Sequence, residues 1–145
     1  MEKKPFGVLP GGEQDFLYTI SNGILTAQIS DFGATLVRLY VQGEDVVLGF
    51  DDANGYLNST TYFGATVGRN ANRIGGARFT LNGKTVQLPQ NEKTNNLHSG
   101  PDSYAYRLWQ VERHTENAIT FSLHSPHGDP SFPGNADIRV TYALA

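Results

Sequence analysis

Two polar stretches of this sequence contain side chains suited to binding a small polar molecule. Residues 68–74 include Asn72 and Arg73, and residues 95–100 include His98. An arginine is always charged and offers five donors in a fixed fork, whereas a histidine can donate or accept a proton near neutral pH. Arg73 could equally be an ordinary surface arginine and His98 an exposed loop residue.

Other polar residues have simpler interpretations. His124 and His127 lie close together, but two histidines without a fixed carboxylate partner are weak evidence for a metal, and we expect none. The sequence has no cysteine, which excludes disulfides and thiolate zinc sites. We expect Asp51, Asp52 and Asp129 to be turn residues, because aspartate side chains hydrogen-bond the local backbone.

Size and charge limit the class of protein. The 145 residues suit one domain, 1–145, and the net charge of −3 comes from 11 basic and 14 acidic residues without a basic cluster. Nucleic acid is therefore not an expected partner. No apolar run approaches the roughly 20 residues of a membrane-spanning helix, and the start lacks the apolar run of a signal peptide. We expect a cytoplasmic protein without a membrane partner.

Short apolar runs with a period of two residues recur between turn residues, which is typical of antiparallel strands. The clearest example is the pair of runs on either side of Asn82-Gly83, the dipeptide most typical of a tight hairpin turn. Asn22-Gly23 and Gln42-Gly43 mark similar turns. The expected strands are 16–21, 25–29, 34–40, 45–49, 78–81, 84–88, 108–114, 119–124 and 137–144.

Long polar segments without a period, 54–62 and 90–106, are expected to be loops, and any site should lie beside them. The last alternating run continues to Ala145 without a turn, so we expect a truncated chain. Strand edges left open in this way could favour a homo-oligomer.

The sequence contains four distinctive motifs: Phe32 to Ala34, GRNANRI at residues 68–74, NNLHSG at residues 95–100 followed by Trp109, and GDPSFPG at residues 128–134. Together they resemble the motifs of the galactose mutarotase (aldose 1-epimerase) family. Ser99 stands where the family usually has glycine, and His127 and Ser131 replace its usual aspartate and glycine. The resemblance implies the N-terminal half of a galactose mutarotase-like antiparallel β-sandwich.

The resemblance also implies a function without any cofactor: interconversion of the α and β anomers of a hexose such as galactose or glucose. An acid and a base must open the sugar ring and close it again. By this resemblance Asn72, Arg73 and His98 bind the sugar, and His98 belongs to the catalytic residues. The family's general base, a glutamate, and its general acid, a second histidine, would lie beyond residue 145, so the chain alone is expected to be inactive.

The alternatives are a non-catalytic carbohydrate-binding module and a non-functional product of a shortened reading frame. Within the motifs, we expect Arg69 to be structural. Trp109 could stack on a sugar, but a tryptophan in an alternating strand is more often in the core, and we expect it there.

Overall fold

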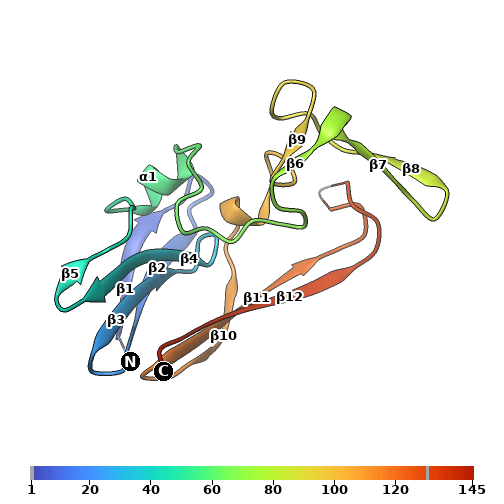
Figure 1. Ribbon diagram of the computed structural model, residues 1–145. Coiled ribbons are helices and arrows are strands. Elements are labelled where there is room, and N and C mark those ends of the chain that lie inside the picture. Colours follow the sequence, from blue (N-terminus) through green and yellow to red (C-terminus); the bar gives the residue numbers. More distant parts are fainter. Residues whose placement is uncertain (1, 130) are drawn as a thin grey trace.

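The computed structural model describes residues 2–129 and 131–145, so Met1 and Pro130, the latter within the predicted 128–134 motif, lie outside it. Two antiparallel sheets form the body of the molecule (Figure 1). The first contains, in spatial order, β1 (Glu2–Val8), β2 (Gln14–Ser21), β3 (Leu25–Ser30), β4 (Thr35–Val41) and β5 (Glu44–Asp45). The second contains β10 (Gln110–His114), β11 (Ala118–Ser125) and β12 (Ala136–Ala143).

The two sheets pack through side chains that alternate along their strands. Burial in β12 alternates between half-buried and exposed residues over its whole length, as a period of two requires. Between the sheets lie Tyr18 and Ile20 of β2 against Ile119 and Phe121 of β11. Phe121 is fully buried and meets the rings of Tyr18 and Tyr142 edge-on. We call these two packed sheets the sandwich.

The other face of the five-stranded sheet is covered by the short helix α1 (Ala53–Leu57), whose Ala53 and Tyr56 pack against Leu17 and Val37. The side chain of Asp52 accepts a hydrogen bond from Gly55 N at 2.9 Å and so caps the start of this helix. A second apolar layer therefore stabilises the sheet from outside.

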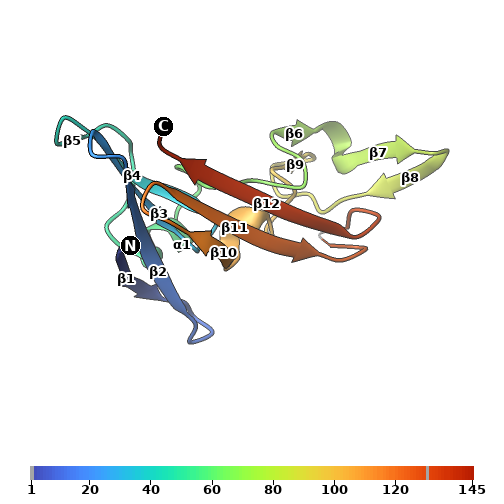
Figure 2. The same ribbon diagram turned by 90° about the horizontal axis from the view of Figure 1, so that it is seen from below.

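A smaller region, residues 68–100, projects beyond the sandwich, and we call it the arm (Figure 2). It contains two short antiparallel pairs, β6 (Arg73–Ile74) with β9 (Asn96–Leu97) and β7 (Arg78–Leu81) with β8 (Lys84–Gln87), and the 3₁₀ turn η1 (Gly75–Ala77). Its buried apolar residues are few: Ala77 and Leu88 pack with Phe132, which belongs to the connection between β11 and β12. The arm is thus attached to the sandwich through that connection.

A pair of carboxyl groups is enclosed in the sandwich. Asp15 is fully buried and accepts hydrogen bonds from Ser30 Oγ at 2.7 Å and Phe32 N at 3.3 Å. Asp31 accepts from Phe16 N at 2.9 Å and from the Tyr18 hydroxyl at 3.1 Å. Burial first, and then the adjacent Asp31 carboxyl, raise the pKa of Asp15 to about 8. Asp15 therefore stays protonated at neutral pH.

The all-β antiparallel class is confirmed, and the hairpin 78–88 forms as predicted, with Asn82 and Gly83 at φ 51° and 75°. Four features of the fold differ from the predictions. Strand β1 was not expected. The strand expected at 45–49 ends at Asp45. The Oδ1 atom of Asp45 accepts hydrogen bonds from Leu39 N and Val47 N, and these contacts turn the chain.

The expected loop 54–62 begins inside α1, and the expected loop 90–106 contains β9 and the 3₁₀ turn η2 (Tyr104–Tyr106). None of the described helices has the length and apolar character needed to cross a membrane.

Candidate functional site

The pairing of β6 with β9 brings the three predicted site residues together. In the register Arg73 lies opposite Leu97, so the next positions, Asn72 and His98, also face each other. Their contact is reciprocal: His98 N donates to Asn72 O at 3.0 Å, and Asn72 N donates to His98 Nδ1 at 3.0 Å. Residues 26 positions apart in the chain therefore form one cluster.

His98 is held in a defined chemical state by this contact. Because Nδ1 accepts a backbone hydrogen bond, it is the unprotonated nitrogen and the neutral ring carries its proton on Nε2. The half-buried ring lies 4.7 Å from the Tyr62 ring, centroid to centroid. Burial, followed by the charge of Arg73, lowers the pKa of His98. The imidazole is therefore a neutral hydrogen-bond donor at pH 7.

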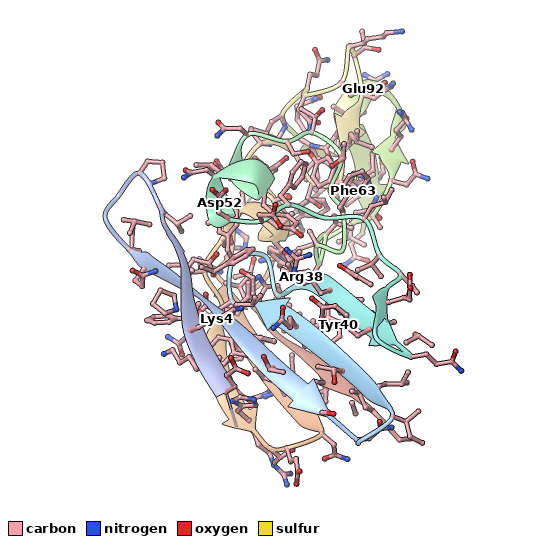
Figure 3. All side chains as sticks on the ribbon, turned by 90° about the vertical axis from the view of Figure 1, so that its left-hand side faces the viewer. Lys4, Arg38, Tyr40, Asp52, Phe63 and Glu92 are labelled. Atoms are coloured by element: carbon pink, nitrogen blue, oxygen red, sulfur yellow. The ribbon has the colours of Figure 1, made fainter. Side chains whose placement is uncertain are left out.

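Arg73 presents an accessible guanidinium beside His98. Its side chain is 54% exposed and has long contacts, 3.4 Å to Asn72 Oδ1 and 3.4 Å to Glu92 Oε1. Such contacts are weak, so most of the fork is available to another acceptor. Figure 3 shows Glu92 near the arm end of the molecule, away from Lys4 and Tyr40 on the sandwich.

Glu92 and Tyr62 join the cluster without having been singled out from the sequence. Contact with Asn95, followed by contact with Arg73, lowers the pKa of Glu92, which makes its carboxylate a weak base. Tyr62 adopts a left-handed backbone, φ 56°, and packs on His98. Both lie in the expected loops, Tyr62 in 54–62 and Glu92 in 90–106, beside which a site was expected, but nothing in the sequence distinguished either residue within its loop.

Arg69 anchors the first site segment to the sandwich, as the structural interpretation predicted. Its guanidinium donates to Ser125 Oγ at 2.8 Å and to the carbonyls of Pro126 at 2.9 Å and Pro133 at 3.0 Å. Gly68 lies flat on the Tyr104 ring, where a Cβ atom would collide with the ring. The start of the segment is therefore fixed on two sides.

Asp129 corrects a prediction, because its carboxylate does more than close a turn. Arg107 donates to both of its oxygens, at 2.5 and 2.6 Å, and Ser125 Oγ donates to Oδ2 at 2.8 Å. This bidentate contact lowers the pKa of Asp129. Asp51 likewise pairs with Arg38, whereas Asp52 has the expected local role.

The remaining candidates lie elsewhere. Trp109 is 3% exposed, and its Nε1 donates to Tyr104 O at 3.0 Å, which confirms the core interpretation. His124 pairs with Asp137 on the exposed face of β11 and β12, and His127 Nδ1 accepts from Gly134 N. Within residues 2–129 and 131–145, no three histidines or carboxylates are grouped to hold a metal ion.

Comparison with known proteins gives the same family in sequence and in structure. A family model described as aldose 1-epimerase matches residues 17–145. The galactose mutarotase of Rattus norvegicus is 41% identical over 145 residues, covering 96% of this chain and 42% of the relative. The aldose 1-epimerase of Haemophilus influenzae is 37% identical over 148 residues, covering 99% and 43%.

Solved structures of similar proteins share the fold. A GalM/aldose epimerase homologue from C. elegans has a TM-score of 0.84 and 37% identity, covering 88% of this chain and 41% of that one. A galactose 1-epimerase from Lactobacillus acidophilus has a TM-score of 0.86 at 22% identity, which supports the fold alone. The chain thus spans less than half the length of the relatives it matches.

Proposed function

Because the chain belongs to the aldose 1-epimerase family, we propose that it carries the sugar-binding part of an enzyme that interconverts the α and β anomers of an aldohexose. In this proposal residues 1–145 form the N-terminal part of one β-sandwich domain, and Asn72, Arg73 and His98 grip the sugar. No cofactor takes part.

The observation that carries the proposal is the reciprocal Asn72–His98 pair next to the accessible Arg73 guanidinium. A sugar hydroxyl loses its water partners on binding, and an unpaired hydroxyl then costs free energy. A neutral imidazole with Nε2–H outward and a guanidinium fork with weak contacts supply donors to replace that water. The arrangement suits neutral, hydroxyl-rich ligands.

Ring opening also needs a base for the C1 hydroxyl and an acid for the ring oxygen. Within the cluster, Glu92 is engaged by Arg73 and Asn95 and is a weak base. We therefore propose that the proton-transfer pair comes from outside residues 1–145, and that His98 contributes to catalysis by holding the sugar oxygen that the pair acts on.

The test combines binding with catalysis. Galactose and glucose titrations, followed by NMR, are expected to shift the amide signals of Asn72, Arg73 and His98 with weak affinity. Polarimetry of freshly dissolved α-D-galactose and α-D-glucose is expected to show the buffer rate when the 145-residue chain is added.

Two variants give these measurements their controls. His98→Ala should remove the shifts, while His124→Ala, which alters an exposed histidine on the sandwich, should leave them unchanged. If no aldohexose shifts these amide signals, the sugar-binding role is contradicted. A mutarotation rate above buffer that vanishes in His98→Ala would contradict the external acid and base.

A further inference from the structure

Ser99 joins the two site segments through a single buried hydroxyl. Its Oγ accepts a hydrogen bond from Asn70 N at 2.7 Å and donates one to Asn70 O at 3.1 Å, and the residue is fully buried. A hydroxyl has one proton to donate, so both of its functions are used on the same backbone residue. Ser99 thereby replaces two contacts that a regular strand pair would make through the backbone.

The position of this contact explains why a side chain is needed. The strand pairing of β6 with β9 ends at Arg73 and Leu97, and only one further backbone hydrogen bond, from His98 N to Asn72 O, follows it. Beyond it, His98, Ser99 and Gly100 have φ values of 51°, 70° and 97°, so the chain leaves the extended conformation and cannot continue the ladder. Side chains of His98 and Ser99 then supply the hydrogen bonds that keep the segments in register.

The His98 side chain contacts Asn72, and the Ser99 side chain contacts Asn70, two residues earlier in the same segment. The His98 ring accepts a hydrogen bond from Asn72 N only if residues 70–72 keep the position along the paired segment that the Ser99 hydroxyl fixes through Asn70. Without that hydroxyl, the N–H and C=O of the half-buried Asn70 would lack these partners, and the segment would shift to find others. His98 Nδ1 would then lose the hydrogen bond that it accepts from Asn72 N.

We propose that Ser99 is a positioning residue, whose hydroxyl holds Asn70 and thereby keeps His98 in the tautomer with its proton on Nε2, directed away from Asn72. The inference rests on the proposed function for the meaning of that proton, which would be donated to a sugar hydroxyl. The state of the His98 ring itself can be measured without any sugar.

The experiment records the imidazole nitrogen signals of His98 by NMR at pH 7 in the unsubstituted chain and in Ser99→Ala and Ser99→Gly. We expect the Nε2–H tautomer to predominate in the unsubstituted chain and an averaged mixture of both tautomers in the two variants. Galactose affinity should fall about three- to tenfold in both, the loss expected for one hydrogen bond.

The two substitutions separate the hydroxyl from backbone strain. Serine and alanine both carry a Cβ atom at the left-handed φ of position 99, so Ser99→Ala removes the hydroxyl and leaves the backbone strain unchanged, whereas Ser99→Gly removes both. If strain were the cause, only glycine would disturb His98. Ser30→Ala is the matched control, because it removes another buried hydroxyl, one that contacts Asp15 in the sandwich.

The outcomes distinguish this inference from the proposed function. An unchanged His98 tautomer in Ser99→Ala, or an equal change in Ser30→Ala, would overturn the positioning role. A tautomer change in both Ser99 variants supports it. If the unsubstituted chain gives no sugar-induced shift, the proposed function fails, while the nitrogen spectra alone still decide the role of Ser99.

Discussion

The sandwich and the arm are stabilised in different ways. The sandwich encloses rings and aliphatic side chains between two sheets and below α1. The arm buries Ala77 and Leu88 with Phe132 and depends otherwise on the short strand pairs β6–β9 and β7–β8 and on hydrogen bonds between backbone and side chains. Regions with little apolar burial open at lower free energy than a core. The candidate site therefore lies in the region expected to open most easily, on a body that holds it in place.

The largest effect is expected from Phe121→Ala, which removes a fully buried ring between the sheets. The free energy of unfolding should fall by about 3–5 kcal/mol, measured by urea denaturation, because a cavity remains where the ring was. Sandwich and arm should unfold together. A variant that loses only arm structure would show that the sandwich is not the foundation of the fold.

A pH-dependent effect is expected from Asp15 in the sandwich. The carboxyl of Asp15 has an ordinary pKa of 3.8 and a folded value of about 8, so between these values the folded state keeps a proton that the unfolded state releases. The stability that this carboxyl contributes is therefore fully present below about pH 4 and is lost as the pH rises through 8. Asp15→Asn should remove this slope and be the more stable protein at pH 8.

Urea denaturation at several pH values tests this effect, and Asp52→Asn is its control. Asp52 is an exposed helix cap, and asparagine caps equally well, so this variant should keep the slope of the unsubstituted chain. Parallel slopes for Asp15→Asn and the unsubstituted chain would refute the buried protonated carboxyl.

A smaller and local effect is expected from Phe132→Ala. The Phe132 ring stacks on Phe79 at 5.7 Å and contributes to the buried cluster of the arm. Its loss should lower the local opening free energy by about 1–2 kcal/mol and speed amide exchange in residues 74–88 about tenfold.

Phe50→Ala is the matched control for that measurement. Phe50 stacks on Phe63 at 5.9 Å with a similar angle, but it packs against the sandwich below α1. It should reduce global stability rather than local exchange protection in the arm. Equal exchange patterns for the two variants would remove the distinction between the regions.

The smallest effect compares two hairpin turns of the same shape. Gln42-Gly43 in the sandwich has φ values of 53° and 86°, and Asn82-Gly83 in the arm has 51° and 75°. Asparagine tolerates this conformation better than glutamine, by about 0.5 kcal/mol. Gln42→Asn should raise the urea midpoint slightly, whereas Asn82→Gln should change only amide exchange in residues 78–87.

Local patterns in the sequence predicted much of this fold. The hairpin around Asn82-Gly83 and the alternation of β12 depend on neighbouring residues, and both formed as expected. Strand β1 was missed because Lys3, Lys4 and Pro5 hide its alternation; only Phe6 in it is buried. Helix α1 has five residues, too few for a helical period to be recognised.

The site was predictable only in part, for a related reason. Asn72, Arg73 and His98 were found through motifs, and the structure brings them together. The roles of Glu92 beside Arg73 and of Asp129 beside Arg107 depend on contacts across 19 and 22 residues. Such contacts arise from the path of the whole chain, and neither carboxylate has a local pattern that reveals them.

The location of Trp109 has a practical consequence for spectroscopy. It is the only tryptophan, it lies in the core between the sheets, and its indole N–H donates to Tyr104, whose ring supports Gly68 at the start of the arm. Its fluorescence therefore comes from a single chromophore at the junction of the two regions. A shift of the emission to longer wavelength would report water entering the core at this junction.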